Sequence, residues 1–99
     1  MWYTPIMKFY HWDTGKNEKL IRERGISFEE VVLAIETGKI LDIVSHPNPG
    51  RYHGQRMYIV EMNGYAYLVP FVEDKAVVFL KTIIPSRKAT KQYLREGLR

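Results

Sequence analysis

Basic side chains that could bind phosphate gather near the C-terminus. From Lys81 onward the chain has six basic residues and one acidic residue, a net charge of +5, whereas residues 1–80 have nine basic and ten acidic residues, a net charge of −1. Four of these cations fall within an arc of about 100° on a predicted helix: Arg87, Lys88, Lys91 and Arg95. Ser86 would begin that helix, where free N–H groups and the helix dipole favour an anion. The pattern predicts a phosphate-binding surface, although a solvated helix face or an acidic protein partner would account for the same charges.

A predicted β-hairpin supplies a second group of candidates. Asn63-Gly64 between two apolar segments is the strongest short hairpin signal. A two-residue turn pairs Met62 with Tyr65, Val60 with Tyr67 and Tyr58 with Val69. One face then carries Arg56, Tyr58, Val60, Tyr65, Tyr67 and Val69, and the other carries Met57, Ile59, Glu61, Ala66 and Leu68. Arginine and tyrosine on a sheet could grip phosphate and stack on bases, but cross-strand tyrosine packing with Arg56 extended over it explains the same pattern.

Lys81 and two histidines are candidates for proton transfer. An even loop length before Lys81 places it on the Glu61 face, and an odd length places it beside Tyr67 and Arg56. His46 and His53 flank the Pro47-Asn48-Pro49-Gly50 break, and a histidine near its ordinary pKa can exchange a proton at neutral pH. Loop histidines are more often simply exposed, and we expect His11 to be structural.

Composition excludes several classes of protein. A chain of 99 residues with 45% hydrophobic residues predicts one domain over residues 1–99, with 1–6 as an N-terminal extension if Met7 is the start. The absence of cysteine excludes disulfides, thiolate zinc sites and cysteine nucleophiles. The three histidines show no metal-ligand spacing, and no phosphate-cradling glycine loop occurs, so we expect no metal and no cofactor. No membrane span or signal peptide is recognisable, which predicts a cytoplasmic protein.

Local signals predict an α+β domain with the order β-α-α-β-β-β-β-α and a small antiparallel meander sheet. Asp13 and Gly25 would bound the first helix, and Ser27 begins a capping box for the second, which Gly38 ends. Ser86 would begin a last helix reaching about Glu96. The predicted strands are Ile6–Trp12, Ile40–Ser45, Arg56–Met62, Tyr65–Val72 and Val77–Ile84, the last closed by Pro85. Both sheet faces carry apolar side chains and only three helices can cover them, so we expect an exposed apolar or aromatic patch that a partner occupies.

Two blocks of the sequence resemble the BrnT-type toxins. The first comprises Phe9-x-x-Trp12-Asp13, Lys16-Asn17, Lys19 and Gly25-Ile26-Ser27-Phe28-Glu29-Glu30, and the second comprises Lys81-Thr82-Ile83-Ile84-Pro85-Ser86-Arg87-Lys88-Ala89-Thr90 with Tyr93. The second is similar to the family's Ile-Ser-Ala-Arg-x-Ala segment. Arg24 stands where the family usually has histidine, and Pro85-Ser86 replaces Ser-Ala, as in a divergent branch.

The resemblance implies the toxin half of a prokaryotic type II toxin–antitoxin pair with a RelE-like fold. It implies an endoribonuclease acting on free or ribosome-bound RNA, with a small DNA-binding antitoxin as partner, in a heterocomplex or as a homodimer. Metal-free cleavage needs a base, an acid and cations for the phosphorane. We assign Arg87 and Arg56 to the phosphate, His46 or Lys81 to proton transfer, and RNA binding to Lys88, Lys91, Arg95, Tyr58 and Tyr67. A non-catalytic nucleic-acid-binding module and a protein-interaction domain are the alternatives.

Overall fold

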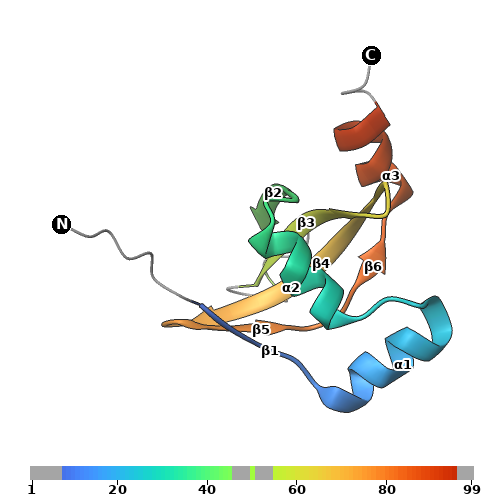
Figure 1. Cartoon of the computed structure of the whole chain (residues 1–99). Coiled ribbons are helices and arrows are strands. Elements are labelled where there is room, and N and C mark those ends of the chain that lie inside the picture. The colour runs from blue at the N-terminus through green and yellow to red at the C-terminus, as the bar shows by residue number, and fades with distance from the viewer. Residues whose placement is uncertain (1–7, 46–49, 51–54, 96–99) are drawn as a thin grey trace.

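The computed structural model describes residues 8–45, 50 and 55–95, and the side chains of all of these except Arg95. Along the chain the elements are β1 (Phe9–His11), α1 (Thr14–Arg24), α2 (Phe28–Glu36), β2 (Ile40–Ser45), β3 (Arg56–Met62), β4 (Tyr65–Asp74), β5 (Val77–Leu80), β6 (Ile84–Pro85), α3 (Arg87–Thr90) and the π-helix η1 (Lys91–Arg95) (Figure 1). The fold is therefore α+β, as predicted.

Side chains at the predicted caps begin and end the first two helices. The Asp13 carboxylate accepts the N–H of Lys16 at 2.8 Å, and α1 ends at Gly25 in the left-handed region with φ 68°. The Ser27 hydroxyl accepts the N–H of Glu30 at 3.2 Å at the start of α2. Thr37 closes α2 by donating its hydroxyl to the carbonyl of Leu33 at 2.8 Å. The predicted N-caps are confirmed.

The sheet has the strand order β1-β5-β4-β3-β2. The predicted hairpin register is confirmed, because Met62 pairs with Tyr65, Val60 with Tyr67 and Tyr58 with Val69. The expectation of a wholly antiparallel meander is wrong at one edge, where β1 runs parallel to β5. After β1, the helices α1 and α2 lead the chain to β2 at the opposite edge of the sheet. The antiparallel strands β2 to β5 then cross the sheet back to β1, and β5 pairs with β1 in parallel.

The C-terminal third differs from its predicted boundaries. β4 continues to Asp74, and the turn consists of Lys75 and Ala76. The predicted strand Val77–Ile84 is interrupted after Leu80, and β6 resumes beside β4 with Pro85 inside it. The last helix changes from α to π geometry after Thr90, whereas a continuous α-helix was expected.

The main core lies between the sheet and the first two helices. On one sheet face, here the inner face, Tyr58, Val60, Val69 and Phe71 pack against Leu20 of α1 and against Phe28, Val31 and Ala34 of α2. The opposite, outer face carries a smaller cluster in which Ile59 and Ala66 meet Ala89 of α3. In Figure 1, α2 lies across the sheet, and α3 stands at the end of β4 remote from the β4–β5 turn. The predicted Arg56–Tyr58–Tyr67 face is thus the face that packs the core.

Within the described residues, every helix is too short or too polar to cross a membrane.

Candidate nucleic-acid interface

Backbone and hydroxyl contacts hold α3 against the start of β4. The N–H of Ser86 donates to the carbonyl of Ala66 at 3.0 Å, and the N–H of Ala66 donates to the Thr90 hydroxyl at 2.8 Å. That hydroxyl, which is buried, donates in turn to the carbonyl of Ser86 at 2.8 Å. The Ser86 hydroxyl accepts the N–H of Ala89 at 3.0 Å, so the start of α3 is capped by its own side chain. A phosphate on this surface would therefore be held by cationic side chains rather than by that N–H group.

One side of α3 and η1 faces the sheet and the other faces solvent. Ala89 is buried, and the Tyr93 hydroxyl donates to the Asp42 carboxylate of β2 at 2.7 Å. That hydrogen bond to an acceptor raises the pKa of Tyr93. Arg87, Lys88 and Lys91 are exposed, and none of them forms an ion pair with another residue in the described part of the chain. We call these three side chains the α3 cations.

Arg56 is engaged by neighbouring side chains. Its guanidinium lies 2.9 Å from the Glu73 carboxylate and 5.2 Å from the centre of the Phe71 ring. Glu73 also accepts a hydrogen bond from Lys8 at 2.8 Å. The Lys8 hydrogen bond lowers the pKa of Glu73, and the charges of Lys8 and Arg56 act in the same direction. Arg56 is thus part of a charge network that joins β3 and β4 to Lys8, the residue before β1, and it would have to leave Glu73 to hold a phosphate.

Lys81 follows β5 on the outer face. The two-residue turn before β5 corresponds to the even loop length, which places Lys81 on the Glu61 face. Its N–H donates to the carbonyl of Pro70 at 2.8 Å, and its ammonium lies 5.9 Å from the centre of the Phe79 ring. Arg56 belongs to the inner face, so the structure does not bring these two predicted catalytic residues together.

The two predicted RNA-binding tyrosines lie on the inner face of the sheet, one buried and one half-buried. Tyr58 is only 4% exposed and stacks on Phe71, with ring centres 4.1 Å apart. Burial raises the pKa of Tyr58 to about 12. The ring of Tyr58 is therefore not exposed for base stacking, because α1 and α2 close the face on which it lies. Tyr67 is half-buried against the same core and meets Tyr65 edge to face at 5.7 Å.

Three predicted positions fall wholly or partly outside the described structure. His46 and His53 lie outside the described residues, so the structure does not place these histidines. Arg95 is described only as the last residue of η1. His11, expected to be structural, is exposed on β1.

Several residues behind the family resemblance prove to connect the helices. Trp12 stacks on Phe28, with ring centres 5.7 Å apart. The buried Asn17 amide accepts the N–H of Phe28 at 2.7 Å and donates to the Glu29 carboxylate at 2.8 Å. The Asn17 hydrogen bond is the main cause of a lowered pKa at Glu29. These contacts build the fold and leave Lys81, Arg87 and Lys88 as the residues of the resembling sequence that could bind phosphate or transfer a proton.

Arg24, at the position where the family usually has histidine, also has a structural contact. Its guanidinium donates to the carbonyl of Ile83 at 2.9 Å. This bond joins the end of α1 to the segment between β5 and β6. No local signal in the sequence points to this contact, because it joins residues 59 positions apart.

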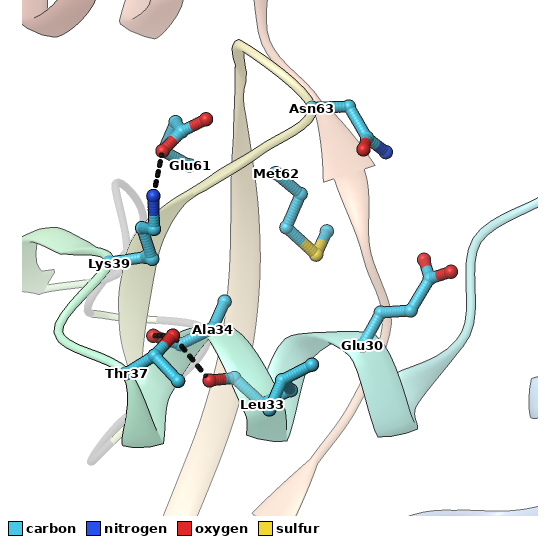
Figure 2. Close-up of a pocket in the computed structure, with 8 residues that line it drawn as sticks. All are labelled: Glu30, Leu33, Ala34, Thr37, Lys39, Glu61, Met62 and Asn63. Atoms are coloured by element: carbon cyan, nitrogen blue, oxygen red, sulfur yellow. Dashed lines mark hydrogen bonds and ion pairs between the residues drawn. The ribbon is translucent and has the colours of Figure 1, made fainter.

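A pocket of about 210 Å³ lies between α2 and the β3–β4 hairpin, and Figure 2 shows its lining. Its charged side chains are Glu30, Lys39 and Glu61, and the last two form an ion pair at 3.4 Å. The N–H of Gly64 donates to Glu61 at 2.9 Å, and this bond lowers the Glu61 pKa. A pocket with two carboxylates and one paired lysine is a poor receptor for phosphate.

Comparisons of the chain with protein-family models, with curated proteins and with solved structures find no match. Among the described side chains, no group of three His, Asp or Glu residues is close enough to hold a metal ion.

Proposed function

We propose that this protein is the toxin half of a type II toxin–antitoxin pair and an endoribonuclease that needs no metal ion. The observation that carries the proposal is the exposed position of Arg87, Lys88 and Lys91 on an element held firmly against the sheet. The resemblance to BrnT-type toxins supplies the reaction. Its RelE-like fold is compatible with the order of two helices, a sheet and a basic C-terminal helix.

The proposed reaction is attack of an RNA 2′-hydroxyl on the adjacent phosphorus. A bond forms between O2′ and phosphorus, and the bond from phosphorus to O5′ breaks. The base takes the proton from the 2′-hydroxyl and an acid delivers one to O5′, so the products are a 2′,3′-cyclic phosphate and a 5′-hydroxyl. Arg87 stabilises the charge of the phosphorane. Of the two candidates for proton transfer, Lys81 is held at Pro70 whereas α3 is held at Ala66, about 13 Å away along β4 at ~3.3 Å per residue, so we assign the transfer to His46. Lys88, Lys91 and Arg95 hold the flanking backbone.

A non-catalytic nucleic-acid-binding module is the second candidate. It is favoured by the separation of Arg56 and Lys81 on opposite sheet faces and by the pairing of Arg56 with Glu73. Such a module would use the same α3 cations and would release RNA unchanged.

Labelled RNA incubated with purified protein in EDTA tests the proposal. We expect the parent protein to shorten the RNA and to leave 5′-hydroxyl ends. Arg87→Ala should lower the cleavage rate by about 10²–10³-fold, because it removes a charge that acts on the transition state. Its melting temperature should stay within a few degrees, since Arg87 is exposed. Arg22→Ala, an exposed arginine on α1, is the matched control and should cleave like the parent.

Other outcomes separate the candidates. A parent protein that shifts RNA on a gel without shortening it is a binding module. A protein that neither shifts nor cuts RNA contradicts both nucleic-acid proposals and supports a protein-interaction domain. Growth arrest on expression, relieved by a neighbouring gene for a small DNA-binding protein, would support the antitoxin as partner.

A further inference from the structure

Among the residues that the structure describes, no helix covers the outer face of the sheet at the end remote from α3. Phe9 of β1 pairs with Val77 of β5, and these side chains are 60% and 40% exposed. Two residues further along each strand, the exposed His11 pairs with the half-buried Phe79. We call Phe9, His11, Val77 and Phe79 the β1–β5 patch. It is the exposed aromatic patch that the sequence led us to expect.

Strand alternation explains why this patch faces outward. Tyr10, Val78 and Leu80 occupy the intervening positions and belong to the main core on the inner face. The outer cluster beneath α3 and η1 centres on Ile59, Ala66 and Ala89, and it does not include the β1–β5 patch. The patch therefore presents two aromatic rings on an open part of the sheet.

Charge beside the patch favours an anionic, aromatic ligand. The Lys81 ammonium lies 5.9 Å from the centre of the Phe79 ring. Asp74 is on the same face, because it pairs with Val77 next to the β4–β5 turn. Burying Lys81 beneath an apolar protein surface would leave its charge without a partner, which is costly. A nucleic acid offers both a base for the ring and a phosphate for the ammonium.

We propose that the β1–β5 patch stacks the bases of single-stranded RNA while Lys81 contacts the adjacent phosphate. This inference rests on the proposed function and names the surface that holds the substrate. Sheet-borne aromatic side chains are a common platform for unstacked bases. The α3 cations and the patch lie at opposite ends of β4, and its residues Leu68 to Asp74 span about 20 Å at ~3.3 Å per residue. A bound strand would therefore run along β4 over several nucleotides.

Fluorescence anisotropy with a labelled, cleavage-resistant 2′-O-methyl oligouridine of about 12 nucleotides tests the proposal. Phe9→Leu and Phe79→Leu keep the apolar volume but remove the ring, and each should weaken binding about tenfold, within the range of one lost base stack. Phe9→Tyr, which keeps the ring, should bind within twofold of the parent. Leu33→Ala is the matched control, because Leu33 is 61% exposed on α2, which covers the inner face.

The outcomes distinguish this inference from the proposed function. If both leucine variants bind like the parent while Arg87→Ala does not cleave RNA, the patch assignment is wrong and the proposed function stands. If the leucine variants bind RNA normally but no longer bind the antitoxin, the patch is a protein-docking surface and the RNA assignment is overturned. A parent protein that neither binds nor cuts RNA overturns both proposals.

Discussion

Two arginines with the same predicted role lie in different environments. Arg56 is paired with Glu73 and packed on Phe71, whereas Arg87 is exposed and has no carboxylate partner among the described residues. A paired guanidinium must lose its partner before it can bind a phosphate, and that loss reduces the net gain. At the residue scale, Arg87 is therefore the better candidate for phosphate binding.

Tyr58 predicts a measurable dependence of stability on alkaline pH. Its pKa is raised to about 12 by burial, from an ordinary value near 10. The folded state therefore holds the Tyr58 proton more tightly than the unfolded state does. The stability that the protonated hydroxyl contributes is complete below pH 10 and is lost as the pH rises toward 12. Urea unfolding at pH 9 and pH 11 should show a larger loss for the parent than for Tyr58→Phe. Equal losses would contradict the buried position of this hydroxyl.

At the element scale, the N-terminal half is held by contacts between α1 and α2. Asn17 of α1 bonds to the first residues of α2, and the Trp12 ring stacks on the Phe28 ring. Phe28 is fully buried at the centre of the main core. The contacts at the start of α2 thus hold α1 and α2 together, and we call this region the α1–α2 joint.

Substitutions at that joint should have graded effects on stability. Ser27→Ala should cost about 1 kcal/mol through loss of the cap. Phe28→Ala should cost about 3–5 kcal/mol through loss of buried area and creation of a cavity. Glu29→Gln is a control for charge, since an amide oxygen can still accept the Asn17 hydrogen bond. If urea unfolding showed a negligible change in stability for both Ser27→Ala and Phe28→Ala, α2 would not pack as described.

The attachment of α3 to β4 gives a second prediction at this scale. The Thr90 hydroxyl is the acceptor for the buried N–H of Ala66. Thr90→Val keeps the shape but leaves that N–H without a partner, at a cost of about 1–3 kcal/mol. The variant should also lower the rate of RNA cleavage, because the α3 cations lose a fixed position. Thr90→Ser keeps a hydroxyl and should preserve both stability and cleavage; equal damage in the two variants would contradict this role.

At the scale of the whole molecule, charge and apolar surface are distributed unequally over the sheet. The first two helices cover the inner face, while α3 and η1 cover one end of the outer face and no other described element packs on it. The outer face therefore combines the α3 cations, Lys81 and the β1–β5 patch. This arrangement gives an extended ligand one continuous side of the molecule to occupy.

Salt dependence should report how many cations contact RNA. For a single strand, the logarithm of affinity falls with the logarithm of salt concentration at a slope of about −0.7 per phosphate contacted. Lys88→Gln combined with Lys91→Gln should therefore make the slope shallower by about 1.4. The control is Lys19→Gln with Arg22→Gln, two exposed cations of α1. If the two double variants change the slope equally, the α3 cations have no special part in binding.

Local signals in the sequence determined the first two helices and the register of the β3–β4 hairpin. Asp13, Gly25 and Ser27 act through contacts within a few residues, and Asn63-Gly64 closes a turn of two residues, so their effects follow from short-range geometry. The alternation of side chains within the hairpin followed from the same turn. The solvent-facing side of the last helix, with Arg87, Lys88 and Lys91, was also predictable from helical periodicity.

Tertiary structure alone decided which sheet face is open. Placing Tyr58 in the core depends on where α1 and α2 pack, and the parallel pairing of β1 with β5 joins segments more than 60 residues apart. The pairing of Arg56 with Glu73 needs the sheet register, and that of Glu73 with Lys8 needs β1 in place. Phe9 and Phe79 had no local signal that separates a core ring from an exposed one. Burial depends on how the elements assemble. The β1–β5 patch could therefore be identified only from the packing of α1 and α2 on the inner face of the sheet.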